Sequence, residues 1–157
     1  MTDPMLAAAP HTDVATGVAM GTRVLTLQGA LAVEYLEPGD RVITRSGARA
    51  LRAVEAVVLH DAAVVTVAAG ALGHDRPEAP LCLPAGQPVM LRDWRAQALY
   101  GCRAAAVPAA RLVDGEFLRA ESRAELRLFR LVFDAPEVIY ADGVELTCAA
   151  AAVAQPA

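Results

Sequence analysis

Turn signals recur along this chain at intervals of roughly eight to twelve residues, too close together for a fold built from long helices. Pro38-Gly39-Asp40 is a tight-turn sequence, because proline presets φ and glycine accepts the positive φ that follows. Ser46-Gly47 and Asp134-Ala135-Pro136 mark further turns. Short apolar segments lie between these signals, so the spacing predicts an all-β fold of many short strands, a sandwich or a barrel-like shape.

The apolar segments themselves read as strands. Residues 126–133 alternate with a period of two, which is typical of a β-strand. His60-Asp61 separates two β-branched runs and is expected to be a hairpin turn. Residues 95–112 are rich in alanine and have room for one short helix, limited by Gly101 and Pro108. The expected strands are Val24–Leu27, Leu31–Leu36, Arg41–Thr44, Leu51–Leu59, Val64–Ala68, Leu81–Leu83, Val89–Leu91, Leu126–Phe133 and Val138–Ala141.

The length of 157 residues fits one domain with a core of its own. We expect a flexible leader over 1–14, the folded domain over 15–147 and an alanine-rich tail over 148–157. Only 4% of the residues are aromatic, so small aliphatic side chains must build the core. Trp94 is expected to anchor a short strand, with a ligand platform as the alternative.

Charge and composition exclude several classes of function. The net charge is −4 without a basic cluster, which argues against nucleic-acid binding. No lysine is present, so neither a Schiff-base nor a P-loop lysine is available. No uncharged segment reaches transmembrane length, so membrane insertion is not expected.

The first thirteen residues lack the positive charge and apolar length of a secretory signal. The cytoplasm is therefore the default compartment, although export by a C-terminal signal stays open. Cysteines 82, 102 and 148 and histidines 11, 60 and 74 show no metal-ligand spacing, so no zinc site or other cofactor is expected. The three cysteines are interpreted as buried free thiols.

Several segments together resemble the bacterial Hedgehog/intein (Hint) autoprocessing domains. No single piece is decisive, and the resemblance depends on their order across roughly residues 17–147. It is carried by Gly21-Thr22-Arg23-Val24, Val33-Glu34-Tyr35-Leu36-Glu37-Pro38-Gly39-Asp40-Arg41-Val42-Ile43-Thr44, Ala69-Gly70-Ala71-Leu72-Gly73, residues 81–94, Arg111-Leu112-Val113-Asp114-Gly115, Leu131-Val132-Phe133-Asp134 and Glu137-Val138-Ile139-Tyr140-Ala141-Asp142-Gly143.

The resemblance implies a compact, horseshoe-shaped β fold whose two ends meet at the active centre. In such a domain a Cys or Ser at the first position attacks the preceding carbonyl. A His in a central motif then polarises that bond and protonates the leaving amine.

The residues that the chemistry needs are replaced in this chain. Matching the family's motifs puts Gly17 at the nucleophile position and Gln87 at the position of the central His. Two further His positions correspond to Arg130 and Pro136. Glycine has no side chain to attack with, and an amide cannot transfer a proton near neutral pH.

The resemblance with these substitutions implies a catalytically degenerate Hint domain, retained as a binding or assembly module for an unknown protein partner. A residual self-cleaving domain is the alternative, with Thr16 or Thr22 as a displaced nucleophile. Against it, His60 and His74 are expected on the surface, and burial in an apolar strand should raise the pKa of Cys82. A third possibility is a structural or export accessory domain.

The charged residues before the last strands have two interpretations. A solvated charged turn is the expected one, and a recognition face is the alternative. They are Glu116, Arg119, Glu121, Arg123, Glu125 and Arg127.

Overall fold

The structure is a computed structural model that describes residues 16–73, 76–92, 96–98 and 101–148. The expected leader over 1–14, His11, His74, Trp94 and residues 149–157 of the expected tail lie outside the described residues. The described elements are β1 (Val18–Ala19), β2 (Arg23–Thr26), β3 (Gly29–Ala32), η1 (Val33–Tyr35), β4 (Arg41–Thr44), β5 (Gly47–Ala50), β6 (Ala53–Val67), β7 (Leu81–Pro84), β8 (Pro88–Leu91), β9 (Ala105–Pro108), η2 (Ala109–Leu112), β10 (Leu118–Val132), β11 (Glu137–Ala141) and β12 (Val144–Cys148).

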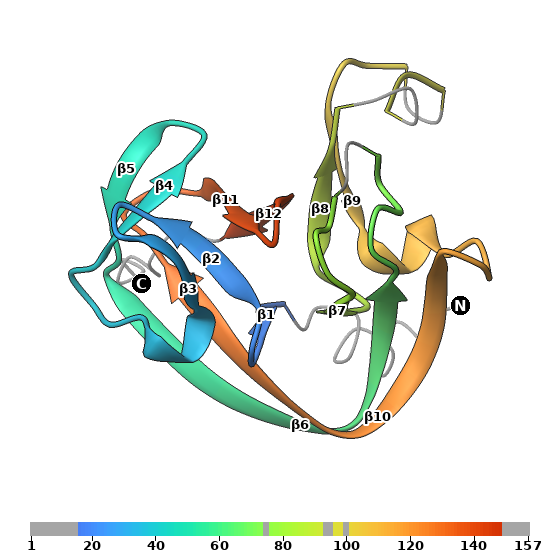
Figure 1. The fold of residues 1–157 in the computed structure, drawn as a ribbon, viewed down its shortest axis with the longest axis horizontal. Coiled ribbons are helices and arrows are strands. Elements are labelled where there is room, and N and C mark those ends of the chain that lie inside the picture. Colours follow the sequence, from blue (N-terminus) through green and yellow to red (C-terminus); the bar gives the residue numbers. More distant parts are fainter. Residues whose placement is uncertain (1–15, 74–75, 93–95, 99–100, 149–157) are drawn as a thin grey trace, which may run out of the picture.

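The strands form two antiparallel sheets. One has the order β1-β10-β6-β7, and the other runs β3-β2-β4-β11-β12-β8-β9 with β5 added beside β4. Figure 1 shows the two long strands, β6 and β10, curving round the base of the molecule, with β2–β5 on one side and β7–β9 on the other. The expected all-β, horseshoe-shaped fold is thus confirmed.

Two hairpins use the same turn chemistry. The Thr26 hydroxyl accepts the Gln28 N–H at 3.0 Å and donates to the Gly29 carbonyl at 2.7 Å. Thr44 makes the equivalent pair with Ser46-Gly47, at 3.1 and 2.7 Å. A threonine that bonds to its own turn closes a two-residue connection, so the turn expected at Ser46-Gly47 is confirmed.

A long ribbon connects the two sides of the horseshoe. β6 and β10 pair from Ala53 opposite Val132 to Val67 opposite Leu118, with an interruption at Asp61 and Ala124. His60-Asp61 lies inside β6, so the turn expected there is wrong. Asp61 has a φ of 52°, which bends the strand without ending it, because pairing with β10 continues in the same register on both sides.

The charged segment before the last strands is also part of the ribbon. β10 begins at Leu118, so the charged turn expected over residues 116–127 is wrong for most of its length. The expected strand Leu126–Phe133 is its second half. Local charge predicts a turn, but β6 supplies a partner that only the folded chain brings near.

Two smaller expectations also changed. The run Leu31–Leu36 divides, because β3 ends at Ala32 and the 3-10 helix η1 follows. In the alanine-rich region, residues 96–98 are helical, and β9 and η2 occupy residues 105–112. No helix within the described ranges has the length and apolar character needed to cross a membrane.

The core is mostly aliphatic, as the composition predicts, with Phe133 as a buried aromatic residue. Its main cluster spans both sheets and includes Val24, Leu83, Val89, Ile139 and Leu146. A smaller cluster fills the bend of the ribbon and consists of Ala19, Ala62, Val64, Leu126 and Leu128. The bend therefore has its own apolar support.

Candidate functional site

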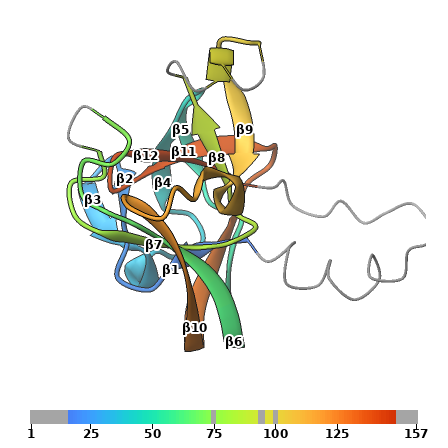
Figure 2. The same cartoon turned by 90° about the vertical axis from the view of Figure 1, so that its right-hand side faces the viewer.

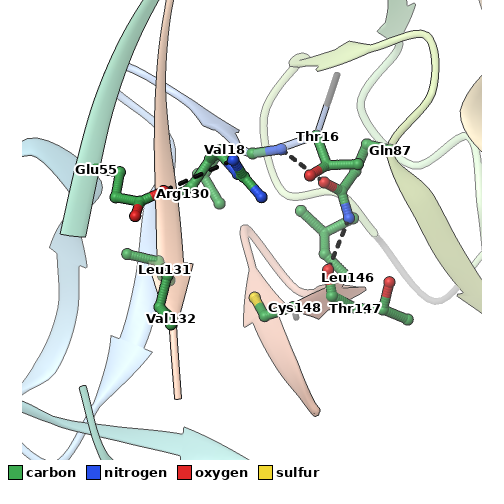
Figure 3. Close-up of a pocket in the computed structure, with 11 residues that line it drawn as sticks. Thr16, Val18, Glu55, Gln87, Arg130, Leu131, Val132, Leu146, Thr147 and Cys148 are labelled. Atoms are coloured by element: carbon green, nitrogen blue, oxygen red, sulfur yellow. Dashed lines mark hydrogen bonds and ion pairs between the residues drawn. The ribbon is translucent and has the colours of Figure 1, made fainter. Parts of the chain in front are cut away.

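A small cavity lies where β1, β10, β12 and the turn between β7 and β8 meet (Figure 3). Its volume is about 180 Å³. It is lined by Thr16, Gly17, Val18, Glu55, Gln87, Arg130, Leu131, Val132, Leu146, Thr147 and Cys148. Segments from both ends of the domain thus contribute to one site.

The fold brings together three of the four site residues that the resemblance implies. Gly17, Gln87 and Arg130 all line the cavity. Pro136 is exposed in the turn between β10 and β11 and is not among the lining residues.

Gln87 is the polar centre of this site and is only 2% exposed. Its Oε1 accepts the Gly17 N–H at 2.8 Å, and its Nε2 donates to the carbonyls of Pro88 at 2.9 Å and Thr147 at 3.0 Å. Both amide hydrogens and the oxygen are therefore engaged, which removes the cost of burying them. The side chain links β1, β8 and β12.

Gly17 is buried and adopts a backbone that other residues avoid. Its φ is +144°, in the range that favours glycine. A Cβ added there would lie 3.3 Å from the Leu128 Cβ, 3.3 Å from the Phe129 carbonyl oxygen and 3.4 Å from the Arg130 Cγ. Any side chain at this position would be both strained and crowded.

Arg130 and Glu55 form an ion pair at the edge of the cavity. They face each other across the β6–β10 ribbon, and the Arg130 Nη1 lies 3.6 Å from the Glu55 Oε1. About half of each side chain is exposed, at 47% and 53%. A solvated ion pair of this kind contributes little to the free energy of unfolding. Its main effect is to place one positive and one negative group at this edge of the cavity.

Cys148 is a lining residue that sequence reasoning did not assign to the site. It is the first residue of the expected tail, 148–157, but the structure places it as the last residue of β12, and nothing in the sequence there signals a site. Burial raises the pKa of its thiol to about 12, and the nearby Glu137 carboxylate adds to that shift. The thiol is thus protonated and a poor nucleophile near neutral pH.

Of the other thiols and candidate nucleophiles, only Thr16 lines the cavity. Burial raises the pKa of Cys82, as expected, although that residue is half-buried. Cys102 is exposed, so the expectation that it is buried is wrong. Of the two threonines, Thr16 lines the cavity, whereas Thr22 is buried and is not a lining residue.

The described part of the chain has no cluster of three or more His, Cys, Asp or Glu residues that could hold a metal ion. His60 is exposed in β6, which confirms its expected surface position.

Solved structures of inteins have the same fold. The gp41-1 intein matches with a TM-score of 0.57 and 12% identity over 84% of this chain and 98% of that one. A bacterial intein-like domain from Clostridium thermocellum matches with a TM-score of 0.57 and 16% identity, covering 85% and 99%. The MchDnaB-1 intein matches with a TM-score of 0.54 and 13% identity, covering 83% and 98%. No curated protein matches the chain.

The sequence match gives the family. A model of the Hint domain fits residues 16–149, a range that begins beside the cavity at Thr16 and ends one residue after Cys148. The family match covers most of the chain and the fold agrees with it, so the chain belongs to the Hint-domain family.

Proposed function

We propose that this chain is a catalytically silent Hint domain that works as a binding or assembly module. The observation that carries the proposal is the state of Gly17, the expected nucleophile position. It lacks a side chain, and its φ of +144° and close neighbours disfavour any replacement.

The expected proton donor supports the same conclusion. Gln87 stands where the resemblance expects the central His, and an amide does not titrate near neutral pH. Its three hydrogen bonds hold the Gly17 N–H and two carbonyls in place. The residue thus fixes the backbone around the cavity, and both of its amide hydrogens are already donated to carbonyls.

No described side chain in the cavity is an obvious substitute. The lining residues include no histidine, Cys148 is protonated near neutral pH, and the Glu55 carboxylate is paired with Arg130. The Thr16 hydroxyl would need a base to activate it. A cavity of about 180 Å³ is smaller than a typical small-molecule site. It suits one side chain or one chain end of a protein partner.

The test is the intact mass of a fusion protein that carries a folded domain before residue 1. After long incubation with and without a strong thiol, we expect a single full-length mass under both conditions. Cleavage would instead release the leading domain. Attack of the Cys148 thiol on the Thr16 carbonyl would form a thioester, free the Gly17 amine and, after exchange with the added thiol, leave a break between Thr16 and Gly17. Attack of the Thr16 hydroxyl on the carbonyl before it would form an ester and leave the break before Thr16.

Two variants interpret any break that appears. Loss of cleavage in Cys148→Ser would identify that thiol as the nucleophile, and loss in Thr16→Ala would identify the hydroxyl. Either result would establish a self-cleaving domain with a displaced nucleophile and overturn the silent-domain proposal.

A further inference from the structure

A second cavity lies at the other end of the strand pair β8–β12 from Gln87. Its walls come from the loop between β6 and β7, the end of β8 and the start of β12. Figure 2 shows β8 and β12 in the upper part of the molecule, away from the bend of β6 and β10. The volume is about 340 Å³, nearly twice that of the first cavity and large enough for a small molecule.

Two arginines from different parts of the fold line this second cavity. Arg76 belongs to the loop between β6 and β7, and Arg92 directly follows β8. The lining carboxylate is that of Glu145, whose Oε1 lies 2.8 Å from the Arg92 Nε and 3.9 Å from the Arg45 Nε. The cavity together with Arg45 thus carries three positive charges against one negative charge, which favours an anionic ligand.

Glu145 orients the Arg92 guanidinium without using all of it. The carboxylate is only 9% exposed and accepts the Arg92 Nε–H, so it holds the arginine in one direction. No further hydrogen bond or ion pair joins the Arg92 guanidinium to the described part of the chain, which leaves both Nη groups for a ligand. A guanidinium fixed in this way can donate two parallel N–H bonds to a carboxylate.

Arg76 is held beside the cavity by the backbone of its own loop. Its N–H donates to the Gly73 carbonyl at 3.0 Å, and its carbonyl accepts the Leu72 N–H at 2.9 Å. The stem of its side chain passes close to Gly143, where an added Cβ would lie 3.5 Å from the Arg76 Cγ. Within the described ranges the exposed Arg76 guanidinium has no ion pair or hydrogen bond. Arg76 therefore brings an unpaired positive charge to the cavity.

The acidic residues nearby do not pair with Arg76. Asp142 and Glu78 line a neighbouring cavity, which Arg76 and Arg23 also border. Neither carboxylate forms an ion pair with Arg76. Burial raises the pKa of Asp142, and the nearby arginine that opposes this rise is Arg23. The positive excess of the second cavity is thus retained.

The other large side chains that line the second cavity are apolar. Leu72 and Met90 are half-buried, and Leu91 and Val144 are buried members of the main core. A ligand that carried charge alone would leave this apolar surface in water, whereas a ligand with an apolar tail would cover it.

We propose that the second cavity binds a small carboxylate with a short apolar tail. The guanidinium groups of Arg76 and Arg92 bind the carboxylate, and the tail packs against Leu72 and Met90. A free acid and the last residue of a peptide both present these two groups, so either can be the source. The second cavity is separate from the one around Gln87, so this site goes beyond the proposed function and does not depend on it.

The experiment follows the backbone amides of the full-length, ¹⁵N-labelled chain by NMR during titration with hexanoate. The amides of Gly73, Gly143 and Glu145 should shift and saturate, and that of Gly17 should not move. Hexanamide has the tail without the charge, and acetate and inorganic phosphate have charge without the tail. Each of the three should bind about tenfold more weakly than hexanoate. N-acetyl-glycyl-leucine separates the sources, because tighter binding than hexanoate supports a peptide end and weaker binding supports a free acid.

Two variants locate the binding. Arg76→Gln removes a charge without leaving a partner unpaired and should raise the hexanoate Kd about tenfold. Met90→Glu places a competing carboxylate in the cavity and should abolish binding. The control is Arg111→Gln, the same change at an exposed residue that does not line the cavity, and it should bind hexanoate as the unaltered chain does.

Several results would overturn the proposal. They are an unaltered chain whose amides do not move with millimolar hexanoate, hexanamide or phosphate that binds as tightly as hexanoate, and an unchanged Kd in Arg76→Gln. The amide spectrum of each variant also shows whether it is folded, so an unfolded variant cannot imitate a loss of binding.

Discussion

At the scale of single residues, Gly17 combines a positive φ with a crowded α-carbon. We expect Gly17→Ala to destabilise the fold by about 2–4 kcal/mol, from backbone strain and overpacking together. Urea denaturation measures this difference. Gly29→Ala is the matched control, because Gly29 has a φ of +105° with no atom within 4 Å of an added Cβ. Equal losses in the two variants would show that crowding at Gly17 is unimportant.

The three thiols should differ in reactivity. Cys102 is exposed and should react first with iodoacetamide, and Cys148 should react last. With a pKa of about 12, only about one Cys148 thiol in 10⁴ is ionised at pH 8. Mass spectrometry of the labelled peptides gives the order, and the denatured chain should label all three alike. Labelling of Cys148 as fast as Cys102 would contradict the burial of its thiol.

The same shift gives a pH dependence of stability. The folded pKa of Cys148 lies above the ordinary thiol value of 9.0, so the folded state keeps a proton that the unfolded state loses. The stabilisation of the folded state by this protonated thiol is fully present below about pH 9. It should fall as the pH rises from there toward 12. Cys148→Ala should therefore show a shallower loss of stability over that range than the unaltered chain.

At the scale of elements, the β6–β10 ribbon depends on one strained residue at its bend. Asp61 has a φ of 52°, which costs a β-branched residue more than it costs Asp or Gly. Asp61→Val should destabilise by about 1–3 kcal/mol, whereas Asp61→Gly should be close to neutral. Urea denaturation again measures both. The control His60→Val, next to it in the exposed strand, should change stability by about 0.5 kcal/mol or less.

The elements that sequence predicted well are those with local signals. The turns at Pro38-Gly39-Asp40 and Ser46-Gly47 carry their own hydrogen bonds, such as the Glu37 N–H to the Asp40 carboxylate at 2.9 Å. The ribbon was predicted poorly, because its pairs join residues far apart in the chain. His60-Asp61 has the composition of a turn, and the pairing of His60 and Ala62 with β10 on either side of Asp61 keeps the segment in a strand.

At the scale of the whole molecule, Gln87 joins segments from both sides of the horseshoe. Gln87→Met keeps the approximate volume but removes three hydrogen bonds and leaves the buried Gly17 N–H unpaired. We expect a loss of about 1–3 kcal/mol in the free energy of unfolding. Hydrogen exchange should accelerate at Gly17 and Val18 before it changes in β6. Uniform acceleration throughout would indicate general destabilisation instead. Gln28→Met, at an exposed position, is the control.

The site was only partly predictable for the same physical reason. Motif order gave Gly17, Gln87 and Arg130, which the fold gathers around one cavity. Cys148 and Glu55 belong to it only because β12 and the ribbon converge there. Pro136 matched a motif position but lies in an exposed turn.

The backbone of Gly17 also bears on the history of the chain. If this position once held a nucleophile, a single substitution back to cysteine would not restore it, because the new side chain would meet the Leu128 Cβ and the Phe129 carbonyl. The strand around it would have to change first, and Gln87 with it. Self-cleavage, once lost, would then not return by one substitution, because the backbone conformation around Gly17 leaves no room for a nucleophilic side chain.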